Sequence, residues 1–236
     1  MTIKHNLKLS KLDQKKGLKL PNSLTDDLAY ICGVLAGDGG IYYREKKKEY
    51  YLQCAGNPKD ERKFYDEVLF KKISQIFGII PKMKLLSSGE IYGFRIYSKT
   101  LYLFLTEVLG LPSGDKNKSL EIPEFILKEG PLLISYLRGV FDTDGCICFK
   151  RKKTYPVISL SSKSDTFISM ISQELKKKGF QFYEVYNYKT IDPRIKKGYT
   201  IKSIIEICGI KHLEKWMNIY NFYNPKHLKK IKDNYK

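Results

Sequence analysis

The sequence predicts an α+β protein made of two pseudo-symmetric half-domains, each with the element order helix, strand, strand, helix, strand, strand, helix (αββαββα). The first observation behind this prediction is a repeat. A helical pattern that ends in an Asp-Gly pair occurs at 25–42 (TDDLAYICGVLAGDGGIY) and again at 131–149 (PLLISYLRGVFDTDGCICF), and Asp144 follows Asp38 by 106 residues. The second observation is that the same alternation of helix and strand patterns follows each copy. One repeat at this long period indicates two similar halves with antiparallel sheets.

Composition indicates a globular protein with a polyanionic partner. The chain has 236 residues, of which 42% are apolar, enough for two modest cores. Lysine and arginine number 43 against 25 acidic residues, and the net charge of +18 exceeds what solubility needs. This balance favours nucleic acid as the partner, with a membrane surface as the weaker alternative. No apolar run is long enough to span a bilayer, so we expect no membrane partner.

Cysteine and histidine usage favours a reduced, intracellular protein without structural zinc. The five cysteines are an odd number, none of them forms a C-x-x-C pair, and there are only three histidines. The N-terminal stretch MTIKHNLKLSKLDQKKGLKLP spreads its lysines evenly and lacks the apolar core of a signal peptide. We expect the protein in the cytoplasm or nucleoid of a prokaryote, or in an organellar matrix.

Residues 1–22 are expected to form a basic lead-in, either loosely docked or frayed, because they carry six lysines against one acid. The first half-domain, 23–110, opens with an explicit helix start. Thr25 can serve as the N-cap, and two aspartates follow in the first turn, where carboxylates oppose the helix dipole. An apolar face at helical spacing comes next, and the glycine pair after Asp38 ends the helix.

Sequence periodicity predicts the remaining elements of the first half. Period-two alternation predicts strands, and apolar residues at helical spacing predict helices. The strands are expected at 41–46, 49–55, 82–87 and 91–97, and the helices over 58–78 and 99–110.

The segment 111–130 is rich in turn formers and is the expected linker between the halves. The second half-domain, 131–221, repeats the order of the first. Its helices are expected over 131–143, 163–180 and 210–221, and its strands at 147–152, 155–161, 182–189 and 199–208. A basic tail, 222–236, is expected after them.

Asp38 and Asp144 are the candidates for a shared metal site. Each is expected at a helix C-terminus, where the dipole disfavours negative charge, and parallel packing of the two helices would bring the carboxylates face to face. Without a cation that arrangement is unfavourable. Gly33, Gly37 and Gly139 favour such packing, because small residues let two backbones approach closely. An Asp-Gly pair alone is a common helix-stop signal, but its repetition in the same context favours a functional site.

The two copies resemble the paired motifs of the LAGLIDADG homing endonucleases, as ICGVLAGDG at 31–39 and LRGVFDTDG at 137–145. The first copy has Ala36 where the family often has an earlier acid. The second copy keeps the motif residues Gly139, Asp142, Asp144 and Gly145. The resemblance extends over residues 25–225 and implies a single-chain pseudo-dimer, monomeric, that places one saddle-shaped sheet per half on DNA.

The resemblance also implies an activity. It implies an intron-encoded homing endonuclease that hydrolyses both strands of a long, asymmetric, double-stranded DNA target. Mg²⁺ or Mn²⁺ would be the cofactor, since phosphodiester hydrolysis is assisted by divalent metals held by hard oxygen ligands. The expected metal ligands are Asp38 and Asp144, with Gly37 and Thr143. Ca²⁺ would bind without supporting cleavage.

Further catalytic residues follow from the same resemblance. It places a basic residue at the start of the helix that follows the fourth strand of each half, which indicates Lys99 and Lys211. A lysine there would stabilise the charge that develops on the phosphate or polarise the attacking water. Gln53 is assigned to the water or metal shell of the site. Asp142 is assigned to packing or capping at the seam between the halves.

Strand alternation predicts the DNA-binding face. With Ile41 and Ile147 pointing to the core, every second residue after each aspartate points to the other side, onto a surface that fits a major groove. The predicted DNA-binding residues are Tyr42, Arg44, Lys46, Gln53, Lys82, Lys84 and Arg95 in the first half, and Cys148, Lys150, Lys152, Tyr188, Lys189 and Lys202 in the second. The two sets differ in residue type, so the sequence predicts an asymmetric target.

Two alternative functions stay open. An intron-encoded maturase of the same fold would bind structured intron RNA without cutting DNA, and a regulator of the same fold would bind DNA without cleaving it. The two retained aspartates and the lack of an appended helix-turn-helix pattern count against the regulator.

Overall fold

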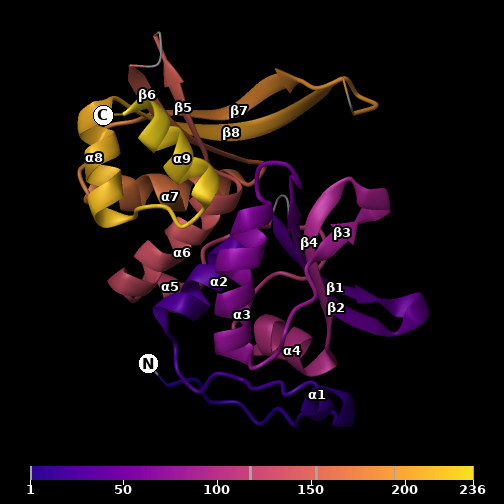
Figure 1. The fold of residues 1–236 in the computed structure, drawn as a ribbon. Coiled ribbons are helices and arrows are strands. Elements are labelled where there is room, and N and C mark those ends of the chain that lie inside the picture. Colours follow the sequence, from indigo (N-terminus) through magenta and orange to yellow (C-terminus); the bar gives the residue numbers. More distant parts are fainter. Residues whose placement is uncertain (1, 117–118, 152–153, 194, 236) are drawn as a thin grey trace.

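The computed structural model describes residues 2–116, 119–151, 154–193 and 195–235. Figure 1 shows two halves, each with one sheet, that meet along a central pair of helices. The first half contains α2 (Asp26–Ala36), β1 (Gly39–Arg44), β2 (Glu49–Gly56), α3 (Phe70–Phe77), β3 (Lys84–Leu86), β4 (Ile91–Tyr97) and α4 (Lys99–Leu103). The second contains α6 (Gly130–Thr143), β5 (Cys146–Lys150), β6 (Tyr155–Ser162), α7 (Asp165–Lys177), β7 (Tyr183–Ile191), β8 (Tyr199–Cys208) and α8 (Ile210–Ile219). The α+β fold with two αββαββα halves is confirmed.

Both sheets are antiparallel and have the same strand order, β1-β2-β4-β3 and β5-β6-β8-β7. Successive side chains along each strand point alternately to the two sides of the sheet. One side packs against the helices of its half, and the other side does not. Ile41 pairs with Leu52 on the packed face, and both are buried. Ile147 pairs with Ile158 in the second sheet in the same way. We call the other side of each sheet its open face.

The helices α2 and α6 pack directly against each other where the halves meet (Figure 1). A methyl group added at Gly33 would lie 2.0 Å from the carbonyl oxygen of Tyr136, and one added at Gly139 would lie 2.2 Å from that of Tyr30. Neither position has room for a side chain, so the two backbones are in contact. The predicted role of these glycines in close helix packing is confirmed.

The second helix of the first half differs in detail from the expected one. Its first full turns form a π-helical segment, Phe64–Leu69, which continues directly into α3. The wider turn lets Phe64, Tyr65 and Leu69 all point into the core. The helix after β4 also widens into a π turn, Phe104–Val108.

The N-terminal lead-in packs against the first half and contains the short helix α1 (Lys11–Lys15). Asp13 is buried there and accepts a hydrogen bond of 2.8 Å from the Thr100 hydroxyl. The backbone N–H of Lys19 donates to the carbonyl of Phe77 over 2.8 Å. These contacts attach the lead-in to both α3 and α4.

The segment predicted as a basic tail is instead a docked helix, α9 (Pro225–Asn234). Asn224 caps it by accepting a 3.0 Å hydrogen bond from the N–H of Lys226, and proline occupies the first turn. His227 and Ile231, one helical turn apart, are both buried. The Lys230 ammonium donates to the carbonyl of Ile147 in β5 over 3.2 Å. A second short helix, α5 (Glu124–Leu127), lies in the linker.

None of the helices in the described part of the chain is both long enough and apolar enough to cross a membrane.

Candidate active site

The two aspartates of the repeat lie together at the C-terminal ends of α2 and α6. Asp38 follows Gly37, whose N–H donates to the carbonyl of Gly33 over 3.1 Å as the last bond of α2. Asp144 caps α6 through a 2.9 Å bond from its N–H to the carbonyl of Val140. The two side chains lie close enough for the charge of Asp144 to raise the pKa of Asp38. Residues that are 106 positions apart thus form one carboxylate pair.

Both carboxyl groups are easier to protonate than ordinary aspartates. Burial, together with the charges of Asp144 and Glu61, raises the pKa of Asp38 to about 7. Burial also raises the pKa of Asp144. Asp144 retains a solvent-accessible surface, but the surrounding groups displace much of its hydration.

Lys116, from the linker, is the first of two cations beside the pair. Its ammonium donates hydrogen bonds to the carbonyl oxygens of Leu35, at 2.6 Å, and Gly39, at 2.5 Å, and also to that of Gly37. Burial lowers the pKa of Lys116, whereas the charges of the aspartates oppose that change. Lys116 therefore binds the free carbonyls at the negative end of the α2 dipole.

The linker reaches this position because it is attached to β1. The N–H of Gly114 donates to the carbonyl of Ile41 over 2.8 Å, and Gly114 has a φ of +80°, which favours glycine. The Ser113 hydroxyl donates to the same carbonyl over 3.3 Å. Two residues later, Lys116 points at the end of α2.

Lys226, from the first turn of α9, is the second cation. Its ammonium lies 3.0 Å from Oε1 of Glu61, and Oε2 of Glu61 accepts a 2.8 Å hydrogen bond from the N–H of Asn57. The charge of Lys226 lowers the pKa of Asp38. Glu61 is almost fully buried, with 5% of its surface exposed. Sequence reasoning assigned neither of these residues to the site.

Lys99 and Lys211 lie away from the aspartates, and their predicted place in the site is wrong. β4 begins opposite the end of β2 that adjoins Asp38 and runs away from it, so that its last residue pairs with Tyr51. Lys99 lies two residues beyond that last residue, and its ammonium lies 5.6 Å from the centre of the Tyr50 ring. Lys211 follows β8 at the corresponding remote end of the second sheet. Lys116 and Lys226 stand beside the pair instead, because each follows the helix that returns from that remote end.

Each aspartate opens on its own cavity. Asp144 lines one of about 280 Å³ whose other charged lining residues are Lys116, Lys163, Lys202 and Asp192. Asp38 lines one of about 650 Å³ whose other charged lining residues are Lys59, Glu61, Glu90 and Lys226. Three lysines face Asp144 and only two face Asp38, where two glutamates offset them. The pseudo-symmetric site is therefore electrostatically asymmetric.

The donor set fits a divalent metal ion. The two carboxylates and the carbonyl of Gly37 are hard oxygen donors of the kind that Mg²⁺ prefers. No group of three or more His, Cys, Asp or Glu side chains within the described residues is arranged to hold a metal. The remaining ligands of an ion between the aspartates would then be carbonyl, water or phosphate oxygens.

The other two residues assigned to the metal shell have structural partners. The Thr143 hydroxyl donates to the carbonyls of Gly139, at 2.9 Å, and Val140, at 3.0 Å, and Thr143 lines the Asp38 cavity. Gln53 lines neither cavity. Its Oε1 accepts hydrogen bonds from both Nε, at 2.8 Å, and Nη2 of Arg95. Gln53 therefore lies on the open face of the first sheet and not in the metal shell.

Asp142 holds the seam together. It is fully buried, accepts a 2.7 Å hydrogen bond from the hydroxyl of Tyr30 in the first half, and accepts from the N–H groups of Tyr223 and Asn224 at 3.0–3.1 Å. The packing role predicted for Asp142 is confirmed. The same bonds fix the start of α9 and hence the position of Lys226.

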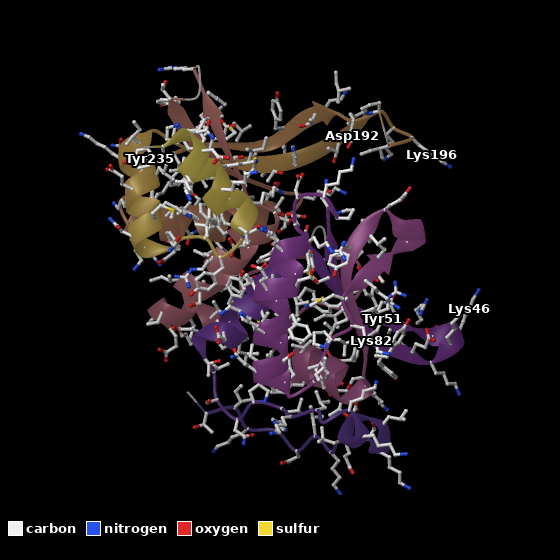
Figure 2. All side chains as sticks on the ribbon, viewed as in Figure 1. Lys46, Tyr51, Lys82, Asp192, Lys196 and Tyr235 are labelled. Carbon is white, nitrogen blue, oxygen red and sulfur yellow. The ribbon has the colours of Figure 1, made fainter. Side chains whose placement is uncertain are left out.

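The open face of the first sheet is aromatic and cationic. Tyr42 pairs with Tyr51, and Tyr51 with Tyr97, in one row across three strands. The Tyr42 and Tyr51 rings stack at 5.1 Å, and Arg44 and Arg95 lie over Tyr51 at 4.9 and 5.0 Å. Lys84 shares this face through its pairing with Gly93. Figure 2 shows Lys46 at the tip of the β1–β2 hairpin, and Lys82 precedes β3.

The open face of the second sheet contains thiols and fewer aromatic groups. Cys148 is half-buried there, and the ammonium of Lys150 lies 3.6 Å from a carboxylate oxygen of Glu206. Tyr188 pairs with Lys202 on the same face. Lys152 lies outside the described residues.

Lys189 points the other way. It pairs with Ile201 and its ammonium lies 4.1 Å from the centre of the Tyr199 ring. A register shift between Val185 and Tyr188 adds a residue to β7 and changes which residues face the open side. The prediction that Lys189 shares the face of Lys202 is therefore wrong.

Residues 131–215 match the family model described as a LAGLIDADG-like domain. The chain is similar to an uncharacterised protein of Methanocaldococcus jannaschii, with 26% identity over 194 residues, which are 78% of this chain and 65% of that protein. It is also similar to part of the glutamine–fructose-6-phosphate aminotransferase of the same organism, with 30% identity over 156 residues, 65% of this chain and 13% of that enzyme. A third relative is the ribonucleoside-diphosphate reductase NrdEB subunit alpha of Bacillus subtilis, 28% identical over 150 residues, 58% of this chain and 13% of that subunit. The chain thus spans less than two thirds of the length of each relative.

Two solved structures show the same fold. One is I-DmoI in complex with DNA and Ca, with 15% identity and a TM-score of 0.58 over 88% of this chain and 97% of that one. The other is the homing endonuclease I-WcaI bound to its DNA recognition sequence, with 19% identity and a TM-score of 0.59 over 94% of this chain and 92% of that one.

Proposed function

Residues 131–215 belong to the LAGLIDADG-like domain family, within a chain that has the fold of the single-chain LAGLIDADG homing endonucleases, and from this premise we propose that the protein is a metal-dependent DNA endonuclease. It would cut both strands of an asymmetric double-stranded target.

The observation that carries the proposal is the pair formed by Asp38 and Asp144. Each half contributes one carboxylate, and the two lie together at the ends of helices that touch at Gly33 and Gly139. A structural role alone would not favour this arrangement, because two adjacent carboxylates at the negative ends of two helix dipoles repel each other. A site that takes up cations and phosphate accounts for it.

A divalent metal bound between the aspartates would supply Lewis-acid activation of the phosphate and of water. The side chains and carbonyls of the protein would have three further roles: they would hold the ion, neutralise charge on the phosphates and bind the duplex. Asp38 and Asp144 would hold the ion, with the Gly37 carbonyl as a further ligand. Lys116 and Lys226 would place positive charge on either side of the scissile phosphates, where negative charge develops. The open faces of the two sheets would hold the duplex through their arginines, lysines and tyrosines.

The similar proteins support this reading in two ways. Structures of I-DmoI with its target DNA include Mn and Mg complexes, which is consistent with a divalent cofactor here. The similar stretches also form a small part of two unrelated enzymes, an aminotransferase and a reductase. A module found inside unrelated enzymes is what insertion of a mobile element into host genes would produce, and this supports a homing role.

The test begins with the target. Duplexes that bind the protein in Ca²⁺ are selected from a random DNA library and then incubated with the protein in Mg²⁺ and in EDTA. We expect Mg²⁺-dependent double-strand cleavage within the selected site. Asp38→Asn and Asp144→Asn, made separately, should each abolish cleavage and leave binding within a few fold. Asp26→Asn, at the opposite end of α2, is the matched control and should cut normally.

Two outcomes would reject the proposal. One is cleavage at the wild-type rate by either Asp38→Asn or Asp144→Asn, which would mean that the wrong acids are assigned. The other is the absence of Mg²⁺-dependent cutting together with tight binding of structured intron RNA, which would favour the maturase.

A further inference from the structure

A basic groove lies outside the two sheet faces, between the segment 59–63 and α9. Its volume is about 600 Å³, and it is lined by Lys59, Asp60, Arg62, Lys63, Pro225, Lys226, Lys229, Lys230 and Asp233. Six of these nine residues are cations and two are acids. The groove was not among the surfaces that strand alternation predicts, because helix-side segments form both of its walls.

Several of the cations have no carboxylate partner among the residues that the structure describes. Lys59, Lys63 and Lys229 are exposed, and none of them forms an ion pair with a carboxylate in the described part of the chain. Arg62 is more constrained, with its Nε 3.6 Å from Asp66 and its guanidinium 4.9 Å from the centre of the Tyr92 ring. Like charges this close together repel, so a bound polyanion would stabilise the groove.

Both sides of the groove are held in place by contacts with the rest of the protein. On the α9 side, the bonds from Tyr223 and Asn224 to Asp142 fix the start of the helix, and buried His227 and Ile231 anchor the turns that follow. On the other side, Phe64, directly after Lys63, is buried in the core. Lys229 and Lys230 thus project from α9, whereas Lys59 lies in a turn and Lys63 at the helix start that precedes Phe64.

The groove is continuous with the Asp38 cavity, since Lys59 and Lys226 line both. A nucleic-acid strand whose phosphate sits beside Asp38 therefore has a path of positive charge leading away from the site. This continuity distinguishes the groove from a solvated patch of surface lysines.

We propose that this groove binds the phosphate backbone of the target duplex on the Asp38 side of the active site. The polyanion is double-stranded DNA because the groove leads out of the cavity that the proposed endonuclease would use, and to that extent the inference rests on the proposed function. Lys59, Lys63 and Lys229 contact phosphates without reading bases, so they add affinity that does not depend on sequence.

The test is the salt dependence of DNA binding. The variant Lys59→Gln/Lys63→Gln/Lys229→Gln is compared with a control of equal charge loss, Lys71→Gln/Lys177→Gln/Lys211→Gln, whose lysines are exposed and line none of the cavities described above. The probe is a mixed-sequence duplex of roughly 40 base pairs in Ca²⁺. The logarithm of the association constant for DNA falls as the logarithm of the salt concentration rises, and each lost phosphate contact should make this slope shallower by about 0.9. The slope should therefore become shallower by about 2 to 3 in the groove variant and stay almost unchanged in the control. Equal thermal melting of the three proteins shows that folding is unaffected.

Three results would overturn the proposal. They are an unchanged slope in the groove variant, an equal loss of slope in the control, and a loss of slope for a structured RNA probe but not for the duplex, which would assign the groove to RNA. If the triple variant fails to melt at the wild-type temperature, Lys63→Gln alone replaces it, with an expected slope loss of about 0.9. Binding is measured without cleavage, so failure of this proposal is distinct from failure of the endonuclease proposal.

Discussion

Lys226 and Glu61 join the two halves of the protein beside the candidate active site, with 3.0 Å between the ammonium nitrogen and Oε1 although 165 residues separate them in the chain. Glu61 belongs to the first half, between β2 and α3, whereas Lys226 begins the helix that packs on the second sheet. The pair therefore connects the position of α9 to the surroundings of Asp38.

Replacing Glu61 with glutamine should destabilise the protein. The carboxylate is almost fully buried, and its removal leaves Lys226 without its partner. We expect the free energy of unfolding, measured with urea, to fall by about 1–3 kcal/mol. Glu124→Gln is the control, because the Glu124–Lys128 pair is exposed, and it should change stability by less than about 0.5 kcal/mol. Equal effects of the two substitutions would show that the Glu61–Lys226 pair contributes no more than a surface pair.

Gly33→Ala should disrupt the seam. The new methyl would meet a carbonyl oxygen of α6 at 2.0 Å, so the helices must separate or the backbone must shift. We expect a loss of about 3 kcal/mol or more in the free energy of unfolding, together with loss of DNA cleavage, because the aspartates move apart with the helices. Gly130→Ala is the matched control, since nothing lies within 4 Å of the added methyl at the start of α6. Wild-type stability of Gly33→Ala would contradict the close approach of the two backbones.

Lys116→Met should separate catalysis from binding. The ammonium lies at the end of α2 beside the carboxylate pair, so its loss removes positive charge from the place where the proposed endonuclease would hold the reacting phosphate. We expect the single-turnover cleavage rate to fall roughly 100-fold with DNA affinity changed only a few fold. Lys99→Met is the control and should cut at the wild-type rate, because Lys99 lies at the remote end of its sheet. A slow Lys99→Met variant with a normal Lys116→Met variant would restore the assignment made from the sequence.

His227 should make the fold less stable in acid. Burial, together with the charges of Lys226 and Lys230, lowers the pKa of His227 to about 4, whereas an unfolded histidine titrates near 6.5. Between these values the unfolded chain binds a proton that the folded chain does not. The contribution of His227 to stability is therefore complete above about pH 6.5 and is lost as the pH falls toward 4, by up to about 3 kcal/mol.

The measurement is the free energy of unfolding in urea at several pH values, for the wild type and His227→Phe. Phenylalanine cannot titrate, so the difference between the two curves isolates the histidine. It should grow in favour of the variant as the pH falls below 6.5. A difference that stays constant from pH 7 to pH 4 would show that His227 titrates normally in the folded protein.

The fold and the two acids were accessible from sequence because both depend on local patterns. Helical and strand periodicity predicted nearly every helix and strand. The N-cap predicted at Thr25 is also present, because its hydroxyl oxygen accepts a 3.2 Å hydrogen bond from the N–H of Leu28. The repeat of an Asp-Gly pair, with small residues at equal spacing, indicated that the halves meet at Asp38 and Asp144.

The site residues that the sequence did not predict come from the segments that follow each half, and their positions depend on how those segments pack. Lys116 and Lys226 lie in a linker and in an apparent tail, and only tertiary packing brings them to the aspartates. A local signal was present for α9, since Asn224 before a proline is a typical helix start. The β-bulge before Tyr188 had no such signal, and it changed the side of the sheet on which Lys189 lies.

The distribution of thiols makes the two halves chemically distinguishable. Cys32 and Cys54, in the first half, are fully buried, and burial raises the pKa of both thiols. Cys146, in the second half, is exposed on the open sheet face, with Cys148 half-buried beside it. A bulky thiol reagent such as a fluorescent maleimide should therefore label one half alone. The protein thus offers a site for attaching a probe or a cross-linker to a single arm without engineering a cysteine, and labelling would report directly on whether bound DNA covers that arm.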